Sequence, residues 1–487
     1  MDRRFSKKVD YILLLLLLLL FMLFFVSTTS PLFDNLYGYD SAFFRFIGSS
    51  ILKGKTPYVD IWDNKGPVLY FIQAIGALHG TQNGKISLIF PMQVISLFVS
   101  VLFLKRADDL LNPSGRWKMI RFFLLTICSL TIFGVTIQGG NLTEEWSLPM
   151  ICCSLYFFTK YMARDGSELT HTRTFSHPRS YAFIHGICFA LIALIRVNNA
   201  VTICAGIIVI GIYLMIHRQW KNIIENIIFG LLGISVVAVP VCLWFASRHA
   251  LEEMLFAVFT FNLKYAGSHS HTNYIGHDFL VRYLPLMICL SLILIHLIRS
   301  RKIRLTDVLS LMIVVLNMLL LGFNNVYLHY FTIVFPVFLF ISIIYVNQTG
   351  IIEVLITAAF FIFMLPDCRM VLYWNFTDNT YPIFPTANMY VPKAERDSMI
   401  GIDVTPEIYL IKGMTPCSRF AAYQPLHFSV EPDFKEEFVK DLQTKQPKWI
   451  VTRCGSKSPY PDIQNIIDTQ YSQNFMDTTY CFYRRNE

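Results

Sequence analysis

The stretch from Tyr37 to Tyr70 reads YGYDSAFFRFIGSSILKGKTPYVDIWDNKGPVLY and directly follows the first long apolar segment of the chain. It is rich in ionisable side chains, while the segments around it are almost entirely apolar. These side chains are Asp40, Arg45, Lys53, Lys55, Asp60, Asp63 and Lys65. Ionisable groups gathered next to a membrane span indicate a site at the bilayer surface that handles a charged ligand.

The composition around this stretch is that of a polytopic membrane protein. Of the 487 residues, 54% are hydrophobic and only 15% are charged, whereas soluble domains carry about a quarter charged residues. The net charge of +8 is modest. The basic residues lie in short loops rather than in a continuous stripe, which argues against a nucleic-acid partner.

A membrane-spanning helix needs about 20 mostly apolar residues, and this length predicts about eleven spans. The expected spans are 11–27, 86–104, 119–137, 147–163, 181–195, 201–217, 225–247, 278–298, 306–322, 328–346 and 350–366. The apolar run 67–79 is too short to cross. We expect it to be an interfacial helix, together with an amphipathic helix over 41–53.

The distribution of basic residues sets the expected orientation, because cytoplasmic loops are enriched in Lys and Arg. A cytoplasmic N-terminus puts most basic loops inside: Lys105–Arg106, Arg116–Lys118, Arg164–Arg179, His217–Lys221 and Arg299–Arg304. The segments expected outside are 28–85, 138–146, 196–200, 248–277, 323–327 and everything after about 366. The run 11–27 also fits a signal peptide behind a basic N-terminus, and in either case the segment after it lies outside.

The C-terminal part differs from the rest in composition. After residue 366 the apolar runs shorten, and Pro, charged residues and turn dipeptides become frequent. A helical pattern over 434–443 precedes a strand-like run over 448–452. The expected organisation is therefore a helical membrane domain over 1–366 and a small extracytoplasmic α/β domain over 367–487.

Cysteine usage agrees with this division. Seven cysteines lie in apolar runs and are expected to be small core residues: Cys128, Cys152, Cys153, Cys188, Cys204, Cys242 and Cys289. An even number in the polar part suits disulfides in an oxidising compartment. Those four are Cys368, Cys417, Cys454 and Cys481, and the sequence leaves their pairing open.

Asp40 and the cations of the first outer loop each have two interpretations. A carboxylate near the membrane surface can act as a general base on an acceptor hydroxyl, but Asp40 also suits the N-cap of the helix expected over 41–53. Cations outside the membrane can hold a phosphate, or can extend towards lipid headgroups from an interfacial helix.

Two further outer segments carry candidate side chains. Glu144 and Glu145 close the second loop, where paired acids are costly unless they are functional or hydrated. The family resemblance described below implies that they bind a sugar, an acceptor or a divalent cation, and the alternative is a hydrated first turn of the next helix. Arg196 ends a span beside Asn198 and Asn199. It can stabilise a departing phosphate, or simply reach the interface from a helix end.

Histidines and aromatic residues complete the set of candidates. His269, His271 and His277 lie in the loop 248–277. They favour a hydrated loop over a metal site, because nothing fixes a third ligand. His329 and Tyr330 begin a late span, where an interfacial aromatic belt is the alternative to substrate contact.

The first outer loop resembles that of the GT-C glycosyltransferases, and specifically the group of lipid A aminoarabinose transferases and protein O-mannosyltransferases. The resemblance covers about forty residues, with Gly66-Pro67 where the family usually has two prolines. The matching positions are Asp40, Gly54, Pro57, Tyr58, Asp60, Trp62, Asp63, Lys65 and Pro67.

The resemblance implies a GT-C-like fold and a set of site residues. Asp40 becomes the expected catalytic base. The expected substrate-binding residues are Lys55, Tyr58, Asp60, Asp63, Lys65, Glu144, Glu145, Arg196, His329 and Tyr330. Glu144 and Glu145 are also weak candidates for a divalent cation, and no other cofactor is expected.

The implied reaction is inverting transfer of a hexosyl or pentosyl group from a polyprenyl-phosphate donor to an extracytoplasmic lipid, glycan or protein. The implied location is a bacterial inner membrane. A lipid-linked sugar flippase or a polysaccharide polymerase or ligase, which needs no base at Asp40, is the alternative. A transporter is disfavoured, since the spans contain almost no charge at mid-membrane. The sugar, the acceptor and the oligomeric state do not follow from the sequence.

Overall fold

The computed structural model describes residues 3–33, 38–79, 87–113, 117–164, 176–267, 276–300, 302–322, 327–346, 350–377, 383–411, 413–455, 457–477 and 479–486. His269 and His271 lie outside these residues. The chain divides into two units, each built from three separate segments. Unit one comprises Met1–Val26, Pro91–Val241 and Ser270–Thr377, and unit two comprises Ser27–Phe90, Cys242–His269 and Asp378–Glu487.

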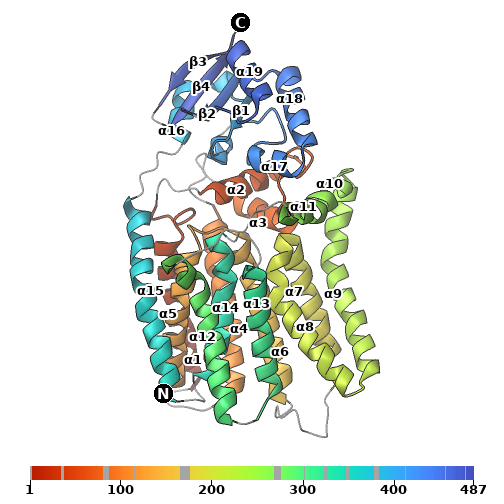
Figure 1. Ribbon diagram of the computed structural model, residues 1–487, viewed down its shortest axis with the longest axis vertical. Helices are drawn as coiled ribbons and strands as arrows, with labels where there is room; N and C mark the ends of the chain where they lie inside the picture. Colours follow the sequence, from red (N-terminus) through yellow and green to blue (C-terminus); the bar gives the residue numbers. More distant parts are fainter. Residues whose placement is uncertain are drawn as a thin grey trace. The chain divides into compact units, whose positions relative to one another are not determined.

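Unit one is a bundle of long apolar helices that run side by side (Figure 1). Helix α6 packs on α7, α8 packs on α13, and α5 contacts both α14 and α15. Its helices are α1 (Arg3–Phe25), α4 (Ile89–Leu111), α5 (Lys118–Thr136), α6 (Thr143–Arg164), α7 (Arg179–Arg196), α8 (Val201–Ile216), α9 (Trp220–Ala246), α12 (His277–Ser300), α13 (Leu305–Gly322), α14 (Val334–Tyr345) and α15 (Ile351–Thr377).

Nine segments within the described residues are long and apolar enough to cross a membrane, which confirms the polytopic helical architecture. The run Arg179–Ile216 contains two of the expected spans. The span expected at 147–163 lies in α6, which is not among the nine because polar residues occupy much of it. The segments are Lys8–Phe25, Ile89–Leu111, Lys118–Thr136, Arg179–Ile216, Trp220–Ala246, His277–Ser300, Leu305–Gly322, Leu328–Tyr345 and Ile351–Thr377.

Two local features shape the bundle. The backbone is extended at Arg196 (φ −163°, ψ 112°) and then forms a 3-10 turn over Val197–Ala200, which separates α7 from α8. Farther along α7, a Cβ added to Gly186 would lie 2.1 Å from the carbonyl oxygen of Gly230. Glycine therefore lets the backbones of α7 and α9 approach closely, as small residues do between membrane helices.

Besides Glu144 and Glu145, three carboxylates described in unit one are almost completely buried, and each has a cationic partner on the chain. Asp108 pairs with Arg121. Asp307 lies 2.9 Å from Arg304, and Glu353 lies 2.7 Å from Arg299. A buried carboxylate without a cation would cost several kcal/mol, so these pairs constrain how the helices that carry them can pack.

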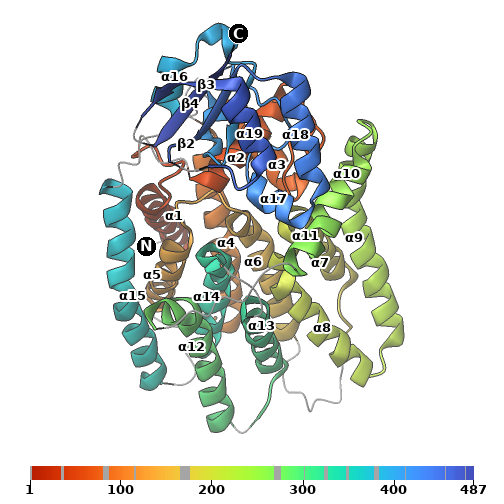
Figure 2. The same ribbon diagram turned by 45° about the horizontal axis from the view of Figure 1, so that its top comes forward.

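Unit two combines short helices with a four-stranded sheet (Figure 2). The strand order is β1-β2-β4-β3, with β1 and β2 parallel and the other neighbours antiparallel. The principal elements are α2 (Tyr39–Leu52), α3 (Pro67–Ala77), α10 (Leu251–Leu255), α11 (Phe261–Gly267), α16 (Ile383–Tyr390), β1 (Met399–Ile402), α17 (Gln424–Val430), α18 (Asp433–Lys445), β2 (Trp449–Arg453), α19 (Pro461–Gln470), β3 (Tyr471–Met476) and β4 (Tyr480–Arg485).

Helices α2 and α3 fill the first outer loop, as the sequence predicts, but α2 is buried on most of its surface rather than on one face. Even Arg45 is only 7% exposed, so its side chain is covered by protein rather than extended towards headgroups. The two helices cross closely at Gly48, where an added Cβ would meet the backbone of Gln73 at 2.5 Å.

Trp62 joins the three segments of unit two. Its indole lies 4.6 Å from the ring of Phe434 and 5.7 Å from that of Phe261 (ring centroids). Its backbone N–H donates to the carbonyl oxygen of Arg419 at 2.8 Å. Two further hydrogen bonds join these segments. The side chain of Asn64 donates to the side-chain oxygen of Asn262 at 2.9 Å, and the side chain of Asn262 donates to the backbone carbonyl oxygen of Asn64 at 2.8 Å.

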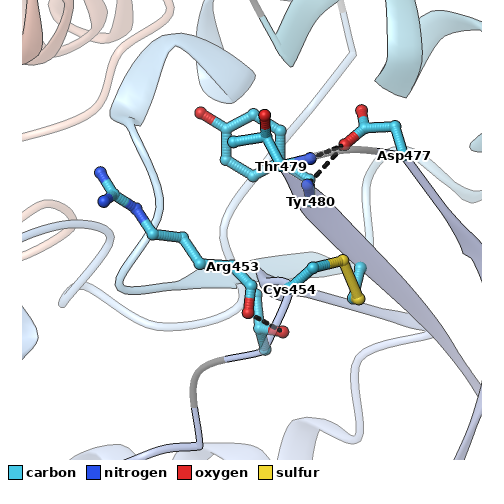
Figure 3. Close-up of a disulfide and its surroundings, with 7 residues drawn as sticks. Arg453, Cys454, Asp477, Thr479 and Tyr480 are labelled. Carbon is cyan, nitrogen blue, oxygen red and sulfur yellow. Dashed lines mark hydrogen bonds between the residues drawn. A yellow bond between two sulfur atoms is a disulfide. The ribbon is translucent and has the colours of Figure 1, made fainter.

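One disulfide joins the end of β2 to the start of β4, through Cys454 and Cys481 (Figure 3). Beside it, the carboxylate of Asp477 accepts from the backbone N–H groups of Thr479 and Tyr480, which fixes the turn into β4. Cys368 and Cys417 are free thiols. Of the four cysteines in the polar C-terminal part, two therefore form a disulfide, as expected. Cys368 lies in α15 of unit one rather than in the C-terminal domain.

We expect Cys454→Ser to lower the free energy of unfolding of unit two by about 3 kcal/mol, because a disulfide that closes a loop of this size restricts the unfolded chain. Thermal unfolding in detergent should give a lower midpoint. Cys417→Ser is the matched control and should change the midpoint much less. Equal midpoints for wild type and Cys454→Ser would contradict the prediction.

Candidate functional site

The residues predicted from the sequence fall into two groups, one in each unit. Unit two holds Asp40, Lys55, Tyr58, Asp60, Asp63 and Lys65, and unit one holds Glu144, Glu145, Arg196, His329 and Tyr330.

Asp40 lies in the first turn of α2 and does not cap it. Gly38 occupies the N-cap position with φ 58°, and no side chain caps the helix. The carboxylate of Asp40 accepts a hydrogen bond from the phenol of Tyr423, which belongs to the C-terminal segment. The N-cap interpretation of Asp40 is therefore wrong, because the helix begins one residue before it.

Tyr423 is held on several sides. Its backbone is left-handed (φ 56°, ψ 27°) just before α17. Its ring centroid lies 4.6 Å from that of Tyr39, 5.7 Å from that of Phe43 and 6.0 Å from that of His427. The aromatic contacts fix the ring, and the phenol oxygen reaches Asp40.

The loop between α2 and α3 is organised by its own side chains. Asp60 accepts from the backbone N–H of Thr56 at 2.7 Å and pairs with the exposed Lys55 at 3.3 Å. Tyr58 has a left-handed backbone (φ 72°), and its buried phenol donates to the carbonyl oxygen of Lys65 at 2.7 Å. In this structure Tyr58 and Asp60 shape the loop that presents Lys65.

Asp63 is a buried carboxylate beside Lys65. It accepts from the phenol of Tyr70 at 2.6 Å and from the backbone N–H of Asn64 at 2.8 Å. Burial raises the pKa of Asp63. The charge of Lys65 and the two hydrogen bonds oppose this rise, whereas the negative charge of Asp40 adds to it. The charges of Lys65 and Asp40 therefore both act on the Asp63 carboxyl group, in opposite directions.

Lys65 is partly buried, and its ammonium donates to the side-chain oxygen of Asn64 at 2.7 Å. The same asparagine pairs with Asn262, so the position of the lysine depends on the segment 242–269. An ammonium held by a neutral amide keeps its full charge available to an anion.

His427 is fully buried, and neither of its ring nitrogens has a hydrogen-bond partner among the described residues. Its ring meets Trp62 and Phe261 edge-on, at centroid distances of 6.4 and 5.9 Å. Burial, helped by the charge of Lys65, lowers the pKa of His427 to about 3. The imidazole is therefore neutral at physiological pH.

In unit one, Glu144, Arg196 and Tyr330 come together. The guanidinium of Arg196 donates to Glu144 at 2.7 Å and lies 3.7 Å from the centroid of the Tyr330 ring. Both carboxylates of the pair at the start of α6 are 1% exposed. The hydrated-turn interpretation of Glu144 and Glu145 is therefore wrong, and Arg196 is ion-paired rather than extended to the interface.

Glu145 stabilises the loop before α6 through hydrogen bonds. It accepts from Gln93 at 2.9 and 3.0 Å and from the backbone N–H of Asn141 at 2.7 Å. Residues 138–141 all have positive φ, and two of the four are glycines, which adopt this conformation without steric cost. His329 lies 2.8 Å from Gln138 of the same loop.

In this structure other groups of the chain contact the carboxylates of both glutamates. The carboxylate of Glu144 binds Arg196, and that of Glu145 is occupied by an amide and a backbone N–H. Across the described part of the chain, no cluster of three or more His, Cys, Asp or Glu side chains could hold a metal ion.

Several residues of the two groups were not found from the sequence. Tyr423, His427 and Asn262 have no motif around them, because their roles arise from contacts between distant segments. Gln93 had a weak signal, since an amide within the apolar run 86–104 needs a partner.

Solved structures with the same fold come from membrane enzymes. ArnT from Cupriavidus metallidurans, bound to undecaprenyl phosphate, is 13% identical with a TM-score of 0.59, and the match covers 98% of each chain. Its apo form gives a TM-score of 0.58 at 13% identity, with 99% of this chain and 98% of that chain covered. The oligosaccharyltransferase of Archaeoglobus fulgidus in the apo form is 12% identical with a TM-score of 0.51, covering 92% of this chain and 70% of that chain.

The chain therefore has the same fold as these ArnT and oligosaccharyltransferase structures, which agrees with the resemblance of the first outer loop. Residues 2–354 match the family described as "Putative competence-induced protein Ccs4 N-terminal domain". The chain belongs to that family. No curated protein sequence matches the chain.

The neutral, buried His427 predicts a pH dependence of stability. Its folded pKa of about 3 lies below the unfolded value of about 6.5, so the unfolded chain binds the extra proton between these values. The imidazole therefore makes unit two less stable as the pH falls below about 6.5.

We expect the unfolding midpoint of His427→Phe to fall less than that of wild type between pH 7.5 and pH 5, in thermal unfolding in detergent. His249→Phe, which changes an exposed histidine of the same unit, is the control and should follow wild type. If His427→Phe loses as much stability as wild type over this range, the lowered pKa of His427 does not contribute to the pH dependence of stability.

Proposed function

We propose that this chain is an integral membrane glycosyltransferase that moves a hexosyl or pentosyl group from a polyprenyl-phosphate donor to an extracytoplasmic lipid, glycan or protein. The GT-C fold and the loop motif from Asp40 to Pro67 support this proposal. Both solved relatives are transferases by name, and the ArnT structure holds undecaprenyl phosphate.

The observation that carries the proposal is the arrangement in unit two of a carboxylate and a cation. A hydrogen bond from Tyr423 orients Asp40. The positive charge of Lys65 lowers the pKa of the neighbouring Asp63, and the negative charge of Asp40 raises it. A base and a cation that both act on the same buried carboxyl group fit the two needs of transfer from a sugar phosphate: proton removal from the acceptor and stabilisation of the departing phosphate.

In the proposed step, the acceptor oxygen attacks the anomeric carbon while Asp40 takes its proton. The bond between that carbon and the phosphate oxygen breaks, and its electron pair leaves with the polyprenyl phosphate. Lys65 stabilises the charge that develops there. A single displacement inverts the anomeric configuration.

We place this reaction on the outer face of a bacterial inner membrane, with the N-terminus in the cytoplasm. The distribution of basic loops supports this orientation. The Cys454–Cys481 disulfide supports it independently, because disulfides persist in oxidising compartments.

We expect Asp40→Asn to reduce sugar transfer by about 10² to 10⁴-fold, the usual contribution of a general base. The purified protein in proteoliposomes is supplied with a panel of polyprenyl-phosphate hexoses and pentoses and with cell-envelope extract as acceptor. Release of free polyprenyl phosphate is measured by mass spectrometry. Asp397→Asn, at an exposed position of unit two, should keep full activity.

Two results would contradict this assignment. One is normal transfer by a folded Asp40→Asn variant, which would favour a protein that needs no base. The other is that wild type consumes none of the donors but moves them across the bilayer, as a flippase would.

Lys65→Gln tests the phosphate site separately from the base. We expect it to weaken binding of undecaprenyl phosphate by about tenfold, because it removes a charge-assisted hydrogen bond to the anion. Native mass spectrometry measures the binding. Lys53→Gln, which removes an exposed cation at the end of α2, is the control, and equal binding by both variants would rule out Lys65 as the phosphate ligand.

A further inference from the structure

The hydrogen bond from Tyr423 to Asp40 joins two residues that are 383 positions apart. One is in the first turn of α2 and the other precedes α17. The C-terminal segment thus supplies a side chain that directly contacts the proposed base. No residue of the loop motif makes this contact.

The phenol of Tyr423 is held in place from both sides. Its ring packs against Tyr39 and Phe43 of α2. On the sheet side, the next residue, Gln424, donates to the carbonyl oxygens of Gly401 and Phe420 at 2.9 and 2.8 Å. Gln424 is buried, so β1 and the turn before α17 fix the backbone that carries the phenol.

The bond has a specific geometry. Tyr423 donates to Oδ1 of Asp40, and none of the described residues donates to Oδ2. A carboxylate held by one oxygen has the other in a defined direction. This is the arrangement in which a third group orients a catalytic base.

We propose that Tyr423 is a positioning residue for the transfer reaction, which orients the Asp40 carboxylate so that Oδ2 faces the acceptor hydroxyl. This inference rests on the proposed function. In the reaction, Oδ2 takes the acceptor proton, the new carbon–oxygen bond forms, and the electron pair of the broken bond leaves with the phosphate. The Tyr423 phenol keeps its proton throughout.

The test is a double-mutant cycle in proteoliposomes with whichever polyprenyl-phosphate sugar of the panel wild type consumes. Tyr423→Phe removes the donor and keeps the ring. We expect it to lower turnover by about tenfold or more, as loss of a hydrogen bond to a charged group does. In the Asp40→Asn background the same change should alter the residual rate by less than about twofold, since the group that Tyr423 orients is no longer a base.

The matched control is Tyr460→Phe. The phenol of Tyr460 donates to the carbonyl oxygen of Pro425 in α17 at 3.4 Å, so this variant removes a tyrosine hydroxyl near the same helix. It should leave turnover unchanged in both backgrounds. Undecaprenyl phosphate binding, measured on all variants, should match wild type, which shows that the lipid site remains formed.

A second substitution addresses the phenol without removing it. With 3,5-difluorotyrosine in place of Tyr423, the hydroxyl is more acidic and loses its proton at lower pH, after which it cannot donate to Asp40. We expect the alkaline fall in turnover to move to lower pH than in wild type. A purely structural ring would not move it.

Two outcomes would overturn the inference while the proposed function stands. One is that Tyr423→Phe transfers sugar as fast as an active wild type does. The other is that the substitution slows transfer in both backgrounds by the same factor, as a general packing defect does. If wild type consumes no donor of the panel, the proposed function fails, and the role of Tyr423 fails with it.

Discussion

The contacts of Trp62 bring together three segments of unit two that are far apart in the sequence. The indole packs against Phe261 from the middle segment and Phe434 from the last, and its N–H backbone group bonds to Arg419. Large aromatic side chains contribute most of the energy of such junctions, because each buries a large apolar area in a fixed geometry. Lys65 and Asp63 lie within three residues of this indole, so the position of both charged groups depends on it.

The two units use different means to keep charged groups out of water. In unit one most of the buried carboxylates pair with arginines, as Glu144 does with Arg196, and Glu145 is an exception that accepts from Gln93 and a backbone N–H. In unit two Asp63 has neutral donors from Tyr70 and Asn64, with Lys65 nearby. A carboxylate held mainly by neutral donors leaves the adjacent ammonium able to bind another anion, whereas an ion pair at close range has largely neutralised both partners.

The sequence was sufficient for features that depend on local pattern. Apolar runs of about 20 residues located the helices of unit one, and turn residues with a short apolar run located the region of β2. The motif after Asp40 led to the fold that the ArnT and oligosaccharyltransferase structures share. Composition also separated the polar C-terminal region from the spans.

Features that depend on contacts between distant segments could not be predicted. The sequence suggests an N-cap at Asp40, but only the fold shows that Gly38 takes this position and that Tyr423 reaches the carboxylate. Likewise, the pattern of Glu144 and Glu145 fits a hydrated helix start. Their burial depends on Arg196 and Gln93, which lie about 50 residues away on either side.

The three-segment construction of unit two has a consequence for biosynthesis. The hydrogen bond from the Arg419 guanidinium to the carbonyl oxygen of Tyr58 spans 361 positions. At 5 to 20 residues per second, the ribosome needs roughly 20 to 70 s to make the intervening chain. During this time the aromatic surface around Trp62 lacks its contacts with the C-terminal segment, such as that with Phe434. A nascent chain of this protein is therefore exposed to chaperones and proteases until translation is nearly complete.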